Sequence, residues 1–137
     1  MKRILVGYDG SEHAAKAFAA AVDLAAKYGA ELEVLCVARP PEPPEMVETE
    51  AMLENAQEHY EQAFAALRPQ AEAAGSHPTL TVLVGNPADQ IIHHANQTGT
   101  DLIVLGHRGK SAIARWLLGS VSKRVLSYAP CDVLIVR

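Results

Sequence analysis

The chain has 137 residues, 49% of them hydrophobic and 20% charged, and a formal net charge of −4 at pH 7. This composition is that of a folded globular protein, and the length predicts one domain over residues 1–137. The acidic balance argues against nucleic acid as a partner. No apolar run approaches the ~18 residues that cross a bilayer, and the beginning of the chain lacks the pattern of a signal peptide. We therefore expect a cytoplasmic protein without a membrane contact.

Apolar runs that predict β-strands alternate with stretches of helical periodicity along the chain. Pro69 is expected to kink or break the second helix near Leu67, because proline lacks the N–H that continues a helix. Wholly apolar strands separated by helices predict an α/β fold, with a parallel sheet covered by helices on both faces. The strands are expected over residues 3–7, 31–37, 80–84, 102–105 and 132–136, and the helices over 11–28, 45–74, 86–97 and 121–128.

Three chemically unusual segments come directly after predicted strands. They are residues 7–11 (Gly-Tyr-Asp-Gly-Ser), residues 37–39 (Val-Ala-Arg) and the glycine-rich stretch that begins at residue 106. In open parallel sheets, ligands bind beyond the carboxyl ends of the strands. We therefore expect the three segments to lie on one rim of the sheet.

The stretch 106–122, with the sequence GHRGKSAIARWLLGSVS, has the features of a phosphate site. Glycine lets the backbone approach an anion closely, and the N–H groups and dipole of a helix N-terminus attract phosphate. Between residues 106 and 131 there are five basic residues and no acidic one, which favours a phosphorylated small molecule. The glycines, and the serines that begin the predicted last helix, are Gly106, Gly109, Gly119, Ser120 and Ser122.

Two common nucleotide motifs are excluded by their spacing. A Walker A loop ending at Gly109 needs a glycine five residues earlier, where the chain has Val104. The dinucleotide-binding pattern needs GxGxxG after the first strand, and Gly7 and Gly10 stand at a different spacing. Six histidines are present, but their spacing does not predict a metal site.

The pattern Gly106-x2-Gly109-x9-Gly119-Ser120 resembles the ATP-binding signature of the universal stress protein family. Other blocks resemble that family in the right order, over residues 4–11, 85–92, 101–109 and 120–136. The resemblance implies an open five-stranded parallel sheet of order 3-2-1-4-5, of the adenine nucleotide α-hydrolase-like type. It also implies a homodimer.

Matching by position carries the family's nucleotide site onto this chain. The resemblance implies that Asp9 lies near the ribose and phosphates of ATP, with Mg²⁺ beside it, while Tyr8 and Gly10 shape that loop. Val37 would meet the adenine. The residues implied to wrap the phosphates are Gly106, Gly109, Gly119, Ser120, Val121 and Ser122. The chain departs from the family at His107, where a small hydroxyl residue is common. For His107, Arg108 and Lys110, contact with phosphate and exposure to water are both open.

The leading hypothesis is an ATP-binding stress or regulatory protein, in which the nucleotide serves as a conformational or assembly signal. No second carboxylate, catalytic histidine pair or nucleophile–base motif accompanies the loop, so we expect at most weak ATPase activity. Two alternatives stay open: a slow ATPase or nucleotide hydrolase that uses Asp9 and Mg²⁺, and a dimeric scaffold that binds AMP or cyclic AMP. The apolar strand 132–136 is expected to pair with its twin in a homodimer.

Overall fold

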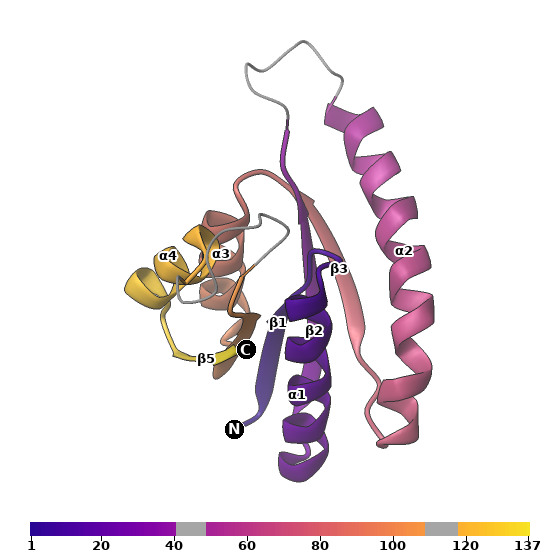
Figure 1. Cartoon of the computed structure of the whole chain (residues 1–137), viewed down its shortest axis with the longest axis vertical. Helices are drawn as coiled ribbons and strands as arrows, with labels where there is room; N and C mark the ends of the chain where they lie inside the picture. Colours follow the sequence, from indigo (N-terminus) through magenta and orange to yellow (C-terminus); the bar gives the residue numbers. More distant parts are fainter. Residues whose placement is uncertain (41–48, 109–117) are drawn as a thin grey trace.

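A computed structural model describes residues 1–40, 49–108 and 118–137 of the chain (Figure 1). The elements are β1 (Arg3–Gly7), α1 (Glu12–Tyr28), β2 (Glu31–Ala38), α2 (Thr49–Ala73), β3 (Thr79–Val84), α3 (Pro87–Thr98), β4 (Leu102–Gly106), α4 (Ser120–Tyr128) and β5 (Asp132–Val136). No helix within the described ranges is both long and apolar enough to cross a membrane. Apart from the beginning of α2, expected at residue 45 and outside the described residues, every boundary agrees with the sequence prediction to within one residue.

The five strands form one parallel sheet in the order β3-β2-β1-β4-β5, which confirms the expected topology. β1 lies at the centre, where Val6 is paired with Val34 of β2 on one side and with Val104 of β4 on the other. The chain progresses from β1 toward β3 and then crosses back to β4, so the strand order reverses between β1 and β4. Ligands of open α/β sheets bind at such a switch point, beyond the carboxyl ends of the strands.

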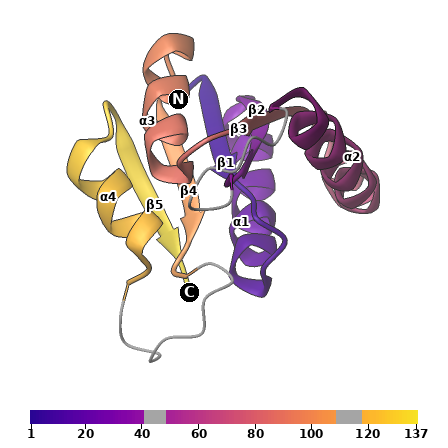
Figure 2. The same ribbon diagram turned by 90° about the horizontal axis from the view of Figure 1, so that it is seen from above.

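Helices cover both faces of the sheet, as expected. α1 and α2 lie on one face, and α3 and α4 lie on the other (Figure 2). Alternate residues of each strand therefore enter different cores. Val6 and Val34 pack with Phe18 of α1, whereas Leu5 and Leu35 pack on the side of α3 and α4.

Local capping explains where α1 and α3 begin and end. The Ser11 hydroxyl accepts a hydrogen bond from the Ala14 N–H at 3.1 Å at the start of α1, and Gly29 ends that helix in the left-handed conformation. The side chain of Asn86 caps α3 in the same way, and Gly99 ends it. Each of these devices acts within about one helical turn, so the sequence alone locates both helices.

Of the kink or break expected near Leu67, the break does not occur. The helix continues through Pro69 to Ala73. Proline removes one backbone hydrogen bond there, but the helix is buried against the core on both sides of it, by Phe64 and by Ala71. The packing of this last turn offsets the missing hydrogen bond.

Candidate functional site

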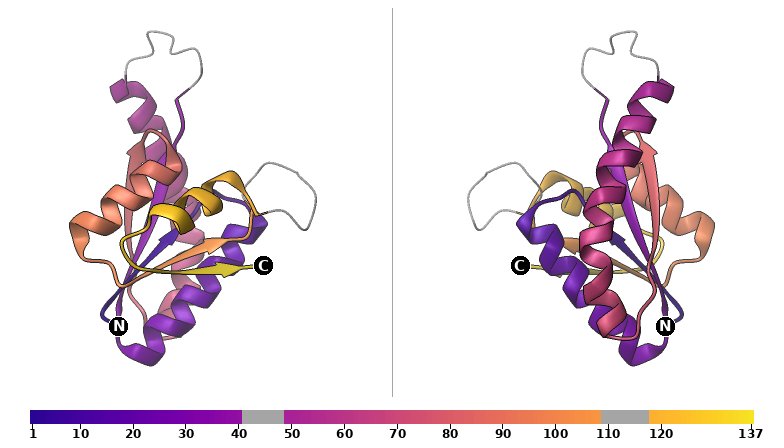
Figure 3. Two further views of the ribbon diagram at one scale, coloured as in Figure 1. Left: turned by 90° about the vertical axis from the view of Figure 1, so that its left-hand side faces the viewer. Right: turned by 90° about the vertical axis from the view of Figure 1, so that its right-hand side faces the viewer.

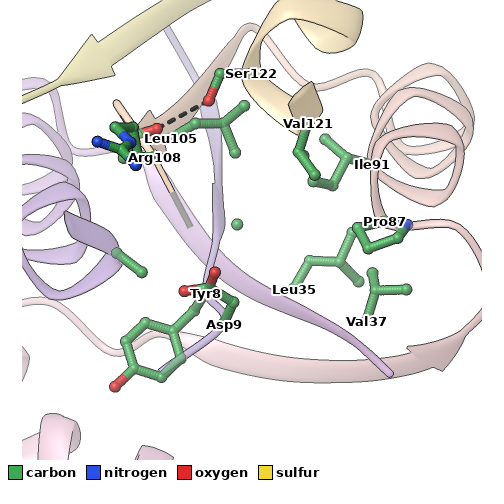
Figure 4. A pocket seen from close by; sticks show the side chains of 13 residues that line it. Tyr8, Asp9, Leu35, Val37, Pro87, Ile91, Leu105, Arg108, Val121 and Ser122 are labelled. Atoms are coloured by element: carbon green, nitrogen blue, oxygen red, sulfur yellow. Dashed lines mark hydrogen bonds between the residues drawn. The ribbon is translucent and has the colours of Figure 1, made fainter. Parts of the chain in front are cut away.

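A pocket opens at the carboxyl ends of β1, β2 and β4, at the switch in strand order (Figure 4). Seven of the eleven residues expected to bind a cofactor line it, although they come from four elements and their loops. These are Tyr8, Asp9, Val37, Gly106, Arg108, Val121 and Ser122. The three segments therefore lie on one rim of the sheet, as predicted. The binding roles of these residues stay predictions.

One side of the pocket is apolar. Figure 4 shows Val37, Pro87 and Ile91 close together, with Val121 of α4 above them and Leu35 of β2 beside them. Leu35 and Val37 point to the same face of β2, because side chains alternate along a strand. Such a surface suits a flat, weakly polar ring.

The charged groups of the pocket, Asp9 and Arg108, lie away from this apolar surface. Asp9 follows β1, and its Oδ1 accepts a hydrogen bond from the Ser11 N–H at 2.9 Å. Gly10 between them has φ +83°, in the left-handed region that glycine adopts without strain. Asp9 therefore shapes the turn before α1 as well as lining the pocket. Arg108 lies across the opening from Asp9 (Figure 4).

Gly106 is required by close packing as well as by the pocket. A Cβ built there would lie 2.7 Å from the carbonyl carbon of His13 and 2.8 Å from its Cβ. Any larger residue would therefore force the end of β4 away from the first turn of α1. The Gly106 carbonyl also accepts a hydrogen bond from the Ser122 hydroxyl at 2.9 Å. The Ser122 hydroxyl therefore ties α4 to β4. The backbone N–H of Ser122, rather than the hydroxyl, is the group that the helix N-terminus leaves open to an anion.

The N-terminus of α4 lies at the pocket without a side-chain cap. Gly119 is the N-cap, and no side chain of the described residues donates or accepts a capping hydrogen bond there. The first intrahelical bond runs from the Lys123 N–H to the Gly119 carbonyl at 3.0 Å. The N–H groups of Ser120, Val121 and Ser122 consequently have no partner within the helix. They and the helix dipole form an anion-binding end.

Three of the remaining expected site residues lie next to the pocket rather than in its lining, and the fourth is not described. Gly10, Gly119 and Ser120 adjoin the pocket through the Asp9 turn and the α4 terminus, and Gly109 lies outside the described residues. The Tyr8 side chain also points away from the pocket in Figure 4 and packs with the core beneath α1 and α2. Burial, with smaller effects of Cys36 and Asp9, raises the pKa of Tyr8, so this hydroxyl stays protonated near neutral pH.

The structure adds apolar pocket residues that the sequence analysis did not single out. They are Ala14, Leu35, Pro87, Ile91 and Leu105, which lie beside Gly7 of the expected segment 7–11. Pro87, Ile91 and Leu105 fall within the blocks 85–92 and 101–109 that resemble the family, so that resemblance could have identified them. Ala14 and Leu35 occupy ordinary helix and strand positions, and only the tertiary structure separates them from the rest of the core.

A divalent cation would find few protein ligands here. Among the described pocket residues, Asp9 is the one carboxylate, and the part of the chain that the structure describes holds no group of three His, Cys, Asp or Glu side chains arranged for a metal. Mg²⁺ is commonly held by one or two carboxylates together with substrate phosphates. The donor set therefore fits Mg²⁺ that arrives with a polyphosphate, with Asp9 as its protein ligand.

Comparison with known sequences gives one consistent result. A model of the universal stress protein family matches residues 1–137. The chain is 36% identical to universal stress protein YxiE of Bacillus subtilis, over 98% of this chain and 98% of that protein. It is 38% identical to a universal stress protein of Thermus aquaticus, over 99% of this chain and 98% of that protein.

Solved structures agree with the sequence comparison. Universal stress protein UspA from Lactobacillus plantarum superposes with a TM-score of 0.89 at 28% identity, covering 99% of this chain and 97% of that one. A universal stress protein crystallised in complex with cyclic AMP superposes with a TM-score of 0.68, again at 28% identity and with 99% and 97% coverage. These neighbours have the fold described above.

Proposed function

This chain belongs to the universal stress protein family, and we propose that it is a regulatory stress protein that binds ATP in the pocket at the carboxyl ends of β1, β2 and β4. One observation carries the proposal: α4 presents to the pocket an N-terminus that no side chain of the described residues caps, in a pocket whose lining is mostly apolar. In contrast, Ser11 and Asn86 cap the N-termini of α1 and α3. An anion on α4 would satisfy the N–H groups that Gly119 leaves without a partner.

The two sides of the pocket suit the two ends of an adenine nucleotide. The adenine lies against Val37 and Ile91, and the triphosphate extends along the first turn of α4 toward Gly106 and Arg108. Asp9 is placed to meet the ribose or a phosphate-bound cation. The complex of a relative with cyclic AMP supports an adenine nucleotide as the ligand class.

Mg²⁺ accompanies the triphosphate in this proposal. When bound, the ion supplies charge neutralisation between phosphate oxygens, and Asp9 holds it on the protein side. The Oδ1 atom of Asp9 already accepts the Ser11 N–H, which fixes the direction of the carboxylate before the ligand arrives.

The pocket is better suited to holding a nucleotide than to cleaving it rapidly. Fast phosphoryl transfer needs a positioned nucleophile together with charge clamps on the phosphates. Among the described pocket residues, Asp9 and Arg108 are the charged groups, and they lie on opposite sides of the opening. A slow ATPase that uses Asp9 to orient water is the second candidate. Steady phosphate release that is lost in Asp9→Asn, while this variant still binds ATP, would establish it.

The proposal includes a homodimer in the cytoplasm, formed by pairing of β5 with its twin. β5 is an edge strand of the sheet, and its outer side faces away from the other elements (Figure 3). Leu134 on this strand keeps 37% of its surface exposed. An apolar edge with open backbone groups is stabilised when a second strand covers it.

The test is calorimetry of the full chain with ATP, ADP, AMP and cyclic AMP, with and without Mg²⁺. We expect the highest affinity for ATP with Mg²⁺, because only the triphosphate reaches both the α4 terminus and the cation at Asp9. Equal affinity for all four nucleotides would favour the AMP or cyclic AMP scaffold. The absence of any heat of binding at millimolar ATP would contradict the proposal. Nucleotide released by denaturing freshly purified protein, identified by mass spectrometry, gives an independent answer.

A further inference from the structure

Two histidines lie side by side behind the rim that carries the proposed phosphate site. Their ring centroids are 6.3 Å apart, with the ring planes at 45°. His13 belongs to the first turn of α1, and His107 follows β4 directly. His107 is 7% exposed, which is unusual for a histidine at the end of a strand.

The backbone of His107 is fixed on both sides. Its N–H donates to the Val136 carbonyl at 2.7 Å, and its carbonyl accepts the Gly119 N–H at 3.0 Å. His107 therefore holds the N-cap of α4 in place while its sequence neighbours Gly106 and Arg108 line the pocket. The backbone of His107 cannot leave the rim without breaking these two contacts.

One polar atom of the pair lacks a hydrogen-bond partner. Nδ1 of His13 is buried and has no hydrogen-bond partner among the residues that the structure describes. A buried polar atom without a partner is uncommon in folded proteins and calls for a physical explanation. The contact between Gly106 and the His13 backbone prevents α1 from shifting to relieve it.

The surroundings oppose a positive charge on His107 when no ligand is bound. Partial removal from water lowers the pKa of His107, and the charges of Arg137, His13 and Arg108 lower it further. These groups come from the end of β5, from α1 and from the residue next to His107. The first turn of α1 adds the positive end of its helix dipole beside His13. A neutral His107 is therefore favoured near pH 7.

We propose that the His13–His107 pair takes up a proton when a polyphosphate binds on the adjacent rim, so that the affinity for polyphosphates rises as the pH falls. The proton comes from water or buffer and binds to a ring nitrogen lone pair. The negative charge of the phosphates favours the imidazolium, reversing the effect of the neighbouring cations. Because two positive rings at this separation would repel each other, the pair gains one proton rather than two.

This inference rests on the proposed function and adds a regulation to it. The proton uptake depends on the charge of the ligand, so ATP couples more strongly to pH than cyclic AMP, which carries one phosphate charge. A fall in pH would thereby raise occupancy by the triphosphate relative to the cyclic nucleotide. His13 and His107 act in this way as a proton-linked determinant of which nucleotide is held.

The test compares ATP affinity of the full chain at pH 7.5 and 6.5, with calorimetry in two buffers of different ionisation enthalpy to count protons. The variants are His107→Gln, His13→Gln and the control His77→Gln, whose exposed side chain lies at the opposite edge of the sheet. ATP itself binds a proton in this pH range. This affects the measured affinity of every variant equally, so the comparison with His77→Gln removes it. Circular dichroism checks that each variant is folded, and the half-buried His13 provides a variant that is less prone to misfold than His107.

Between pH 7.5 and 6.5, the gain in ATP affinity should be about threefold larger for the wild type and His77→Gln than for His107→Gln. This factor corresponds to the uptake of about half a proton on ATP binding. His13→Gln should also show a smaller gain in ATP affinity than the wild type. Equal pH dependence and equal proton counts in all four proteins would overturn the inference while leaving ATP binding intact. If the wild type binds no ATP at either pH, the proposed function fails, and this inference fails with it.

Discussion

The hydroxyl of Ser122 donates a hydrogen bond to the carbonyl oxygen of Gly106 at 2.9 Å, and so joins the first turn of α4 to the end of β4. Ser122 is 4% exposed. The bond therefore fixes the direction of the α4 N-terminus at a part-buried position beside the pocket. The anion-binding end of the helix is directed at the pocket by this contact.

Ser122→Ala should lower the free energy of unfolding by about 1 kcal/mol, because the Gly106 carbonyl loses the partner of a part-buried hydrogen bond. ATP affinity should fall with it, since the α4 terminus is no longer held. Urea denaturation and calorimetry measure the two effects. Ser127→Ala is the matched control: its exposed hydroxyl bonds to the Lys123 carbonyl at 3.0 Å in the same helix. This control should change stability by less than about 0.5 kcal/mol. Equal losses in the two variants would contradict the special role of Ser122.

Gly119→Asp tests whether phosphate occupies the N-cap of α4. Gly119 has φ −63° and ψ 157°, a conformation open to any residue, and aspartate is a strong N-cap. The added carboxylate should stabilise the helix by only a few tenths of a kcal/mol relative to glycine. It should weaken ATP binding about tenfold, since it bonds to the same N–H groups and repels phosphate. Gly119→Ala adds a Cβ without the carboxylate and serves as control. If aspartate and alanine weaken binding equally, the effect is steric and the assignment of these N–H groups is wrong.

Acid should destabilise the protein partly through His107. Its pKa in the folded protein lies below the usual 6.5, so between these two values the unfolded chain binds more protons than the folded one. The free energy of unfolding therefore falls as the pH drops below 6.5, and this contribution levels off once the pH is below the folded pKa. His107→Gln should show a flatter pH dependence in urea denaturation between pH 7.5 and 5.5. A curve parallel to that of the wild type would show that His107 is protonated alike in both states.

Leu134→Lys should disrupt the proposed dimer. A lysine on an edge strand is a device by which proteins prevent edge-to-edge pairing. Leu53→Lys is the control, because Leu53 on α2 has the same 37% exposure but lies on another element. Light scattering at micromolar concentration should report a dimer for the wild type and Leu53→Lys, and a monomer for Leu134→Lys. A wild-type monomer would remove dimerisation through β5 from the proposal.

Much of the fold could be predicted because its causes are local. Ser11 and Asn86 cap their helices within one turn, and Gly29 and Gly99 end them in a conformation that other residues adopt with strain. Pro69 shows the limit of such reasoning. Its local effect is to break a helix, and tertiary burial of the following turn overrides it. The strand order came from the resemblance to a family, since apolar strands carry no local mark of their neighbours.

Only part of the site could be predicted, because only some of its residues have a local signal in the sequence. Glycines and serines near strand ends indicated the rim, and the structure gathers Asp9, Val37, Gly106, Arg108 and Ser122 around one pocket. The role of Gly109 stays a prediction, because that residue lies outside the described part of the chain. So do the binding roles of the others and the single domain over residues 1–137. Nothing local distinguished Leu35 or Ala14 from other core residues.

The sequence by itself determined the alternation of strands and helices and the phosphate-like pattern from Gly106 to Ser122. Each depends on contacts within a few residues or on residue type alone. Only the tertiary structure decided that Gly106 is pressed against His13, that the Ser122 hydroxyl is used within the protein, and that two histidines 94 positions apart (107 − 13) share one site. These relationships depend on strand register and helix packing, which bring distant segments together and which no short stretch of sequence specifies.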